Sequence, residues 1–205
     1  MQQSFYTVKE SVTNELVEKK SRFIANVFYI QNEEEAIRKI EEIKKTNRDA
    51  RHNVYAYRLA NGQEKYSDDG EPSGTAGVPI LDILRGEQLV NVLIVVTRYF
   101  GGILLGTGGL VRAYGGVAKL ALGETCKVEM KLCTEYRITL DYDSFNALQY
   151  YCKNNNIKIL STNFLDKIEI NVLVIDSTAS KFLHDLGEIT NRNIHYEEVN
   201  QYYHE

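Results

Sequence analysis

The sequence predicts an α+β protein of two domains, and three observations lead to this prediction. Segments in which apolar and polar residues alternate are interleaved with segments whose apolar residues recur every three to four positions, so strands and helices are mixed. The run from Leu89 to Thr97 is almost continuously apolar, as in a central strand buried on both faces. From residue 131 the predicted order is strand, helix, strand, strand, helix, strand, which is the ferredoxin-like order. We therefore expect domains at residues 1–130 and 131–205.

The composition is that of an ordinary globular protein. The 205 residues are 43% hydrophobic and 25% charged, which is enough apolar material for a real core. Residues 131–205 carry the whole net charge of −4, whereas residues 1–130 are neutral overall, so the first domain is the better candidate for binding an anion.

The cysteines and the first residues of the sequence indicate in which cellular compartment the protein is expected. Cys126, Cys133 and Cys152 are odd in number and form no CxxC pair, which argues against a disulfide framework or a zinc site. The chain shows no signal-peptide pattern at its start and no apolar run of the ~20 residues that a bilayer requires. We therefore expect a cytoplasmic protein with no membrane partner.

The first domain opens with three extended segments and one amphipathic helix. Residues 3–8, residues 12–17 and Ser21 to Ile30 read as strands. Asn32 can cap the helix that follows, because three glutamates occupy its first turn and isoleucines form an apolar stripe along it. The remaining predicted elements are a strand at His52 to Leu59, a hairpin strand at Gln63 to Tyr66, a helix from Pro79 to about Arg85, the buried strand, and a helix from about Gly108.

The second domain is predicted to contain two helices and four strands. Asp143 or Ser144 is expected to cap the first helix, and Asp176 or Ser177 the second. The predicted elements are a strand at Glu135 to Tyr142, a helix at Ser144 to Asn154, strands at Ile157 to Phe164 and Lys167 to Ile175, a helix at Thr178 to Thr190, and a strand at Ile194 to Val199.

A glycine-rich stretch from Thr97 to Gly116 is the first candidate site. Seven of the chain's 14 glycines lie there, with two arginines and no acidic residue. A glycine-rich turn before a helix can present main-chain N–H groups to phosphate, but the stretch matches neither the Walker A pattern nor GxGxxG. Glycines required for a tight turn and close packing explain the pattern equally well. The candidate contacts are Arg98, Tyr99, Phe100, Gly101, Gly102, Gly106, Gly108, Gly109 and Arg112.

An acidic loop at Asp68, Asp69 and Glu71 is the second candidate, with His52 as a further accessory residue. The three carboxylates are close enough in sequence to hold Mg²⁺ or to serve in acid–base chemistry. A loop of this kind is more often a structural turn, or its carboxylates hold arginines elsewhere in the fold. The four histidines lack the spacing of a metal cluster, and no GxSxG elbow is present, so no metal site and no hydrolase are predicted.

Several long motifs resemble one known family. They are Lys20 to Ala25 (KSRFIA), His52-Asn53, Ser67 to Gly77 (SDDGEPSGTAG), Val95 to Gly102 (VVTRYFGG) and Leu105 to Tyr114 (LGTGGLVRAY). Over about residues 20–122 they are similar to the IMPACT (YigZ) family. The C-terminal half resembles the small domain that bacterial members append.

The resemblance implies a fold and a role. It implies that the first domain has the left-handed βαβ fold of the second domain of small-subunit ribosomal protein five, and that the second domain is similar to the last domain of elongation factor G. The eukaryotic relative regulates translation by competing for the ribosome-associated activator of a starvation-responsive kinase. The implied role is therefore translation-associated, with RNA, a ribosomal surface or a translation-related protein as partner and with no cofactor.

Two other functions stay open. The GHMP kinases share the first fold and use a glycine-rich loop for phosphates, so a phosphate- or nucleotide-binding enzyme is the alternative, with the glycine stretch and the acidic loop at one site. A protein-interaction module is the third. The sequence favours binding over catalysis, because no motif in it specifies a reaction.

Overall fold

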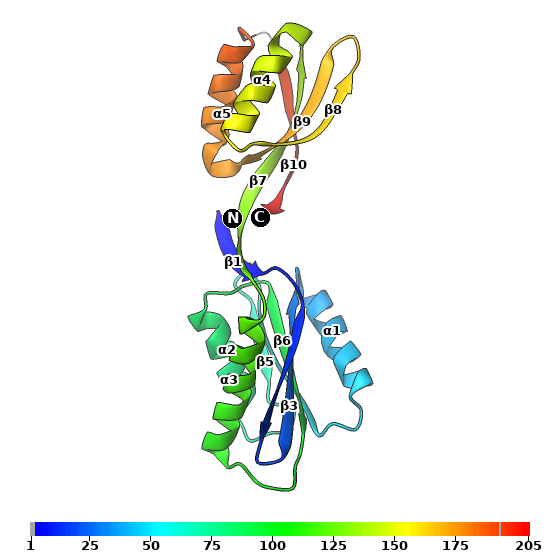
Figure 1. The fold of residues 1–205 in the computed structure, drawn as a ribbon, viewed down its shortest axis with the longest axis vertical. Coiled ribbons are helices and arrows are strands. Elements are labelled where there is room, and N and C mark those ends of the chain that lie inside the picture. The colour runs from blue at the N-terminus through cyan, green and yellow to red at the C-terminus, as the bar shows by residue number, and fades with distance from the viewer. Residues whose placement is uncertain (1–2, 193) are drawn as a thin grey trace. The chain divides into compact units, whose positions relative to one another are not determined.

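The computed structural model describes residues 3–192 and 194–205, which form two compact units (Figure 1). One is Phe5–Glu129, called here the N-terminal unit. The other, the C-terminal unit, is Met130–Glu205 together with residues 3 and 4. Within the described residues, every helix is too short or too polar to cross a membrane.

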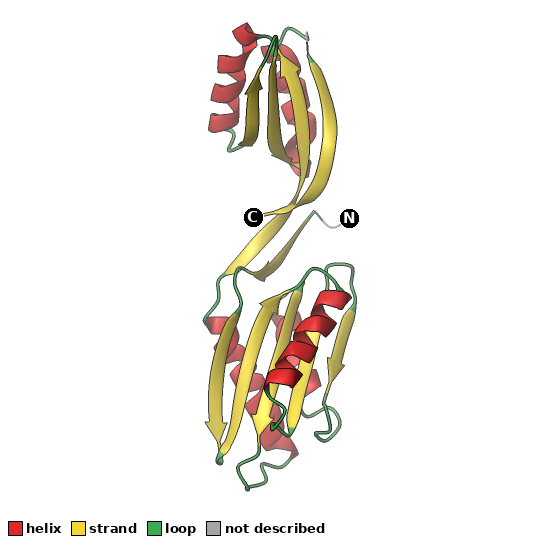
Figure 2. Cartoon of the chain, turned by 90° about the vertical axis from the view of Figure 1, so that its right-hand side faces the viewer, coloured by secondary structure: helices red, strands yellow, loops and turns green. Residues whose placement is uncertain are grey.

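The N-terminal unit contains a five-stranded antiparallel sheet with helices on both faces (Figure 2). The strand order is β2-β3-β6-β4-β5. Helix α1 packs on one face, and helices α2 and α3 pack on the other. The elements are β1 (Ser4–Val8), β2 (Val12–Glu18), β3 (Ser21–Tyr29), α1 (Glu33–Thr46), β4 (His52–Arg58), β5 (Glu64–Ser67), α2 (Gly77–Gly86), β6 (Val92–Tyr99) and α3 (Thr107–Gly123).

Strand β6 lies at the centre of this sheet, between β3 and β4. Its side chains alternate between the two cores: Leu93 and Val95 face α1, whereas Ile94 and Val96 face α2 and α3. The predicted burial on both faces is confirmed, but the strand begins three residues later than predicted. Asn91 has a φ of 57°, a left-handed conformation that interrupts an extended chain.

Helix α1 begins where the sequence predicts. The Asn32 side chain accepts a hydrogen bond from the Glu35 backbone N–H, as an N-cap should. In the first turn, the Glu33 carboxylate accepts hydrogen bonds from Tyr57 on β4, from Gln63 and from Lys65 on β5. The helix is therefore fixed to the sheet by polar contacts as well as by its apolar stripe.

The Glu33 contacts predict a pH dependence of stability. The hydrogen bond from Tyr57 is the largest of the effects that lower the pKa of Glu33 to about 2, from its usual value of 4.5. A carboxyl whose pKa is lowered on folding stabilises the fold above pH ~4.5 and loses this contribution as the pH falls toward 2. Urea unfolding between pH 5 and pH 2 should therefore show a weaker pH dependence for Tyr57→Phe than for the wild type.

Tyr55, two residues before Tyr57 on the same strand, supplies the control. Tyr55 stacks on Tyr57 with a centroid separation of 6.4 Å, and no hydrogen bond joins its hydroxyl to Glu33. Tyr55→Phe should keep the pH dependence of the wild type. If both variants weakened the pH dependence of stability equally, ring packing and not the hydrogen bond to Glu33 would be the cause of that dependence.

The C-terminal unit has the predicted order strand, helix, strand, strand, helix, strand. The elements are β7 (Lys127–Leu140), α4 (Tyr142–Asn154), β8 (Lys158–Phe164), β9 (Ile168–Ile175), α5 (Asp176–Ile189) and β10 (His195–His204). All the pairings in the order β10-β7-β9-β8 are antiparallel, and both helices pack on one face over a common core. This confirms the ferredoxin-like fold.

Several details in this unit differ from the predictions, and the largest is that β7 begins at Lys127 and not at Glu135. Strand β10 extends five residues beyond Val199, because its pairing with β7 continues past an irregularity at Glu198/Asn200. The predicted caps are wrong for both helices. Asp143 and Ser144 lie inside the first turn of α4, and Asp176 opens α5, where its carboxylate accepts hydrogen bonds from Thr134 and Gln201 of the neighbouring strands.

Candidate functional site

The glycine-rich stretch forms the loop from β6 to α3, and two of its glycines are required by the backbone path. A Cβ on Gly101 would lie 2.0 Å from the carbonyl carbon of Lys20, in the turn between β2 and β3. Gly106 has a φ of 73° at the start of α3. Tight packing and a left-handed turn therefore explain part of the glycine clustering. The close approach at Gly101 brings the loop against the β2–β3 turn.

Helix α3 begins in this loop with an uncapped N-terminus. Its N-cap residue is Gly106, which has no side chain to accept from the first turn, and that turn contains no acidic residue. The first N–H groups of a helix have no partner within the helix, and they carry the positive end of its dipole. Gly106 and Thr107 line a cavity of about 340 Å³. The uncapped start of α3 therefore lies at one edge of the cavity.

The rest of the cavity combines an apolar wall with a charged floor. Phe100, Leu104, Leu105 and Leu110 form the wall. Leu104 is 83% exposed and Phe100 is 38% exposed, so this wall is accessible at its rim. Arg51, His52, Glu71 and Arg98 are the charged or titratable lining residues. The cavity thus joins residues from β4, the acidic loop, β6 and α3.

Arg98 and Glu71 form a buried ion pair at the floor. Arg98 Nη1 lies 2.5 Å from Glu71 Oε1, and the two side chains are 6% and 4% exposed. The guanidinium also lies over the rings of Phe23 and Phe100, at 5.3 Å and 5.5 Å from their centroids. Arg98 Nε is buried with no hydrogen-bond partner within the described chain. The guanidinium is therefore enclosed by protein groups and does not lie at the surface.

Tyr114 and His52 complete the surroundings of Glu71. The Tyr114 hydroxyl donates to Glu71 Oε1 at 2.8 Å, and burial, followed by the Glu71 charge, raises the pKa of Tyr114. His52 Nδ1 lies 2.7 Å from the Asp69 carbonyl oxygen, which requires that Nδ1 carry a proton. Its Nε2 lies 3.7 Å from Glu71 Oε1. The same carboxylate oxygen therefore faces three side chains.

The other two acids of the loop have structural partners. The Asp68 carboxylate accepts hydrogen bonds from the backbone N–H groups of Gly74, Ala76 and Gly77, and so caps α2 from a distance. This is why α2 begins at Gly77, two residues before the predicted Pro79. Asp69 accepts from the backbone of Asn53 and from Lys44. Among the described residues, no three His, Cys, Asp or Glu side chains converge as metal ligands would.

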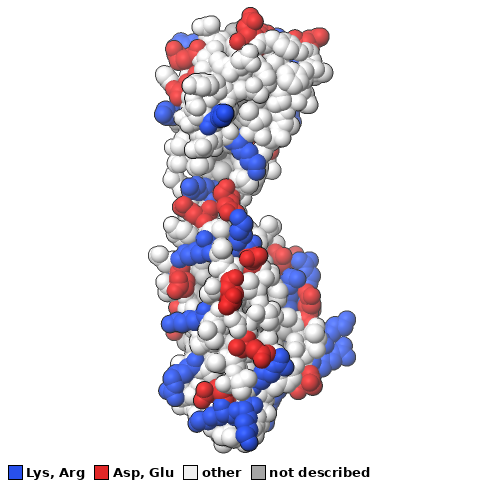
Figure 3. All heavy atoms as spheres, in the orientation of Figure 1, with Lys and Arg blue, Asp and Glu red and all other residues white. Residues whose placement is uncertain are grey.

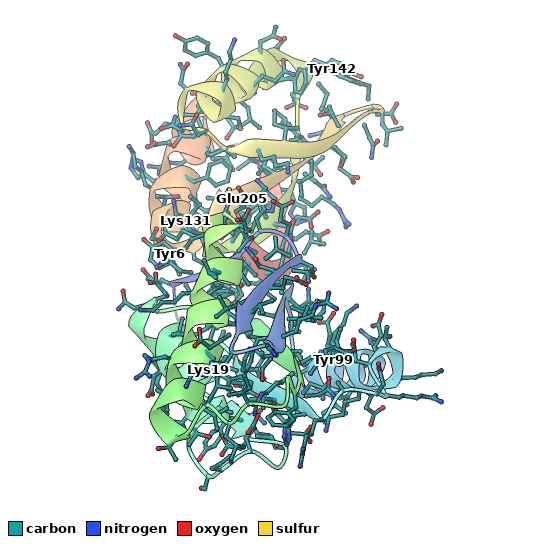
Figure 4. All side chains as sticks on the ribbon, turned by 60° about the horizontal axis from the view of Figure 1, so that its bottom comes forward. Tyr6, Lys19, Tyr99, Lys131, Tyr142 and Glu205 are labelled. Carbon is teal, nitrogen blue, oxygen red and sulfur yellow. The ribbon has the colours of Figure 1, made fainter. Side chains whose placement is uncertain are left out.

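The structure separates the remaining predicted site residues from this cavity. Tyr99 points to the opposite face of the sheet, where its hydroxyl donates to Asn47 at the end of α1 (Figure 4). Arg112 lines a smaller cavity of about 210 Å³ together with Lys19 and Gly109. Gly102 has a φ of 83°, and Gly108 lies in the first turn of α3. The predicted residues therefore form two adjacent groups, with Tyr99 apart from both.

Sequence reasoning missed Arg51, which lines the cavity, and Ser21 and Tyr114, which contact the residues of its charged floor. Arg51 lies over the Phe100 ring at 5.6 Å, although it precedes its strand and carries no motif signal. Ser21 lies within hydrogen-bonding distance of both Arg98 Nη2 and the Gly101 N–H. Tyr114 ends the motif LGTGGLVRAY, but the sequence did not indicate its contact with Glu71. Pairing partners from distant strands cannot be read from the spacing of a single sequence.

Comparisons with known families match both units. The family described as "Impact N-terminal domain" matches residues 19–122, and a domain of unknown function (DUF1949) matches residues 138–191. A crystal structure described as that of a hypothetical protein is 30% identical to this chain. The alignment covers 98% of this chain and 99% of that one, with a TM-score of 0.66.

Curated relatives extend the match over most of the chain. IMPACT family member YvyE of Bacillus subtilis is 37% identical, with 93% of this chain and 89% of the relative covered. IMPACT family member YigZ of Escherichia coli is 34% identical, with 84% and 86% covered. The Protein IMPACT homolog of Dictyostelium discoideum is 44% identical, but only 44% of this chain and 28% of the relative are covered. The chain therefore belongs to the IMPACT family.

Proposed function

We propose that the N-terminal unit binds RNA, with a ribosomal surface as the physiological target. The contact surface, called here the loop surface, consists of Arg51, Phe100, Leu104, the first turn of α3, and Arg112 with Lys19. The observation that carries the proposal is the uncapped N-terminus of α3 at a cavity whose mouth holds Arg51 and an exposed aromatic ring. Main-chain N–H groups and an arginine suit a phosphate, and the ring suits a base.

The surrounding charge supports this assignment. Lys and Arg side chains, with some Asp and Glu among them, lie at the end of the N-terminal unit that contains the β2–β3 turn and the loop before α3 (Figure 3). Lys19 and Lys20 occupy that turn with φ values of 44° and 62°. Cations on several neighbouring segments can follow a phosphate backbone. Membership of a family with eukaryotic IMPACT proteins is consistent with a translation-related role.

Arg98 takes a different role from the phosphate contact expected from the sequence. Its charge is balanced by Glu71, and its guanidinium is enclosed between two aromatic rings. We assign the phosphate contacts to Arg51 and Arg112, and we assign to Arg98 the task of holding Glu71 in the cavity floor. The alternative of a magnesium-dependent nucleotide enzyme has less support, because Asp68, Asp69 and Glu71 are bound by different parts of the fold.

The proposal predicts salt-dependent RNA binding through these two arginines. Affinity for single-stranded RNA should fall as salt rises, with a log–log slope that decreases by about 0.7 for each phosphate contact removed. Arg51→Ala and Arg112→Ala should each weaken binding and reduce the slope. Fluorescence anisotropy over a salt series, together with cosedimentation with ribosomes, measures both effects.

The control is an arginine on the opposite face of the sheet. Arg38 lies on α1 with its side chain 72% exposed, so Arg38→Ala removes one positive charge without touching the loop surface. It should bind RNA as the wild type does. The proposed site would be contradicted if RNA affinity did not depend on salt, or if all three variants reduced the salt dependence equally. Recovery of a protein partner that survives nuclease treatment, without RNA binding, would favour an interaction module.

A further inference from the structure

Within the described residues, only one oxygen of the Glu71 carboxylate, Oε1, accepts hydrogen bonds. Arg98 Nη1 and the Tyr114 hydroxyl both donate to Oε1, and His52 Nε2 is nearest to the same atom. Within the described chain, Oε2 has no hydrogen-bond partner. Among the described residues, Arg98 Nε is the fully buried side-chain polar atom that lacks a hydrogen-bond partner, so Oε2 is not fully buried. Because Glu71 lines the cavity and its Oε1 is already occupied, Oε2 is the acceptor of this side chain that is left for a molecule in the cavity.

From this atom we infer that the cavity takes one unpaired nucleobase whose amino group donates a hydrogen bond to Glu71 Oε2. The inference rests on the proposed RNA binding and names the part of the RNA that the cavity selects. The base would lie against the apolar wall of Phe100 and Leu104, with the adjoining phosphate at Arg51 and the first turn of α3. The volume of about 340 Å³ lies within the range of small-molecule sites.

The charges around the cavity favour a neutral donor at the floor. Arg98 already balances Glu71, and Arg51 and the positive end of α3 add further positive charge at the mouth. A cationic ligand would meet these groups, whereas an anion at the floor would meet the free carboxylate oxygen. A nucleotide suits both the floor and the mouth of the cavity, because its base is neutral and its phosphate is negative.

The same acceptor predicts a choice among bases. Adenine, cytosine and guanine each carry an exocyclic amino group, which can donate to a carboxylate. Uracil has no amino group, and its two carbonyl oxygens flank a single N–H. A carboxylate oxygen approaching that edge is repelled by the carbonyl oxygens. The cavity should therefore disfavour uridine.

The decisive comparison uses the wild-type protein and needs no substitution. Short single-stranded RNA oligomers of adenosine, of purine riboside and of uridine have equal charge, and purine riboside differs from adenosine by the missing amino group. At one salt concentration, the adenosine oligomer should bind about tenfold more tightly than the other two, because an unmade hydrogen bond would leave the Glu71 oxygen desolvated. Fluorescence anisotropy measures the three affinities.

The outcomes separate this inference from the proposed function. Equal affinity for adenosine and purine riboside oligomers, with the expected salt dependence, would overturn the base-binding inference and leave RNA binding intact. If no oligomer bound at all, RNA binding itself would fail, and the inference with it. A tenfold preference with an unchanged salt slope would support both, because the amino group carries no charge.

A substitution then assigns the preference to Glu71. Glu71→Gln keeps the shape of the side chain and replaces the carboxylate with an amide, which can donate to a carbonyl oxygen of uracil. The preference for adenosine over uridine should shrink or reverse, while binding to the loop surface remains. Circular dichroism and thermal melting establish that the variant is folded. An unchanged preference in a folded variant would place the amino contact elsewhere and overturn the inference.

Discussion

Arg98→Ala should destabilise the N-terminal unit by about 3–5 kcal/mol, the cost of leaving one partner of a buried ion pair without the other. Glu71 is 4% exposed in the wild-type fold, and the substitution removes the guanidinium that balances its charge. The substitution also removes the cation between Phe23 and Phe100. Urea unfolding followed by far-ultraviolet circular dichroism gives the free energy of unfolding.

A second Arg–Glu pair supplies the control. Arg22 and Glu15 lie 2.7 Å apart on neighbouring strands, but their side chains are 53% and 50% exposed. Exposed pairs contribute about 0–1 kcal/mol, so Arg22→Ala should change the free energy of unfolding little. The two variants remove the same charge from the same sheet. Equal destabilisation would show that burial of the Arg98 pair is not the cause.

Gly101→Ala should destabilise the same unit by about 3 kcal/mol or more, because overpacking against a rigid backbone cannot be relieved locally. The added Cβ would lie 2.0 Å from the Lys20 carbonyl carbon and 2.4 Å from the Ser21 nitrogen. The loop and the β2–β3 turn would have to separate. Thermal melting should show the loss, and RNA affinity should fall because the loop carries Phe100 and Leu104.

Gly123→Ala is the matched control for this clash. Gly123 ends α3, and a Cβ built there meets nothing within 4 Å. Alanine is favoured over glycine in helices by up to about 1 kcal/mol, so this variant should be as stable as the wild type or slightly more stable. If Gly101→Ala behaved like Gly123→Ala, the close approach to Lys20 would not constrain the loop.

The fold was largely predictable because periodicity reports burial directly. The alternation on β3, the apolar stripe of α1 and the continuous apolar run of β6 each follow from which faces contact a core. Element ends were less predictable. Asn91 interrupts an apolar run through its backbone conformation, and Asp68 starts α2 from nine residues away. Neither effect leaves a periodic signal.

The sequence indicated part of the arrangement around the cavity, whereas its binding role stays a prediction. The glycine stretch and the acidic loop do meet at one cavity, through Arg98 and Glu71. The sequence left open whether the acids bind a metal or hold arginines, and the structure gives Glu71 an arginine as its partner. The sequence analysis grouped Tyr99, the last residue of β6, with Phe100, because only the packing shows which side of the sheet carries the cavity. Arg51 was missed because its role depends on a ring 49 positions away.

The central position of β6 also fixes an order of events during synthesis. Strands β3 and β4 do not pair with each other, since each pairs with β6, which is made after both. The two cores on either side of the sheet likewise need side chains from β6. Until Val92–Tyr99 has been made, the nascent chain holds two incomplete hydrophobic layers. Folding of the sheet is therefore delayed until the middle of the chain emerges, and the earlier strands are open to non-native pairing during that interval.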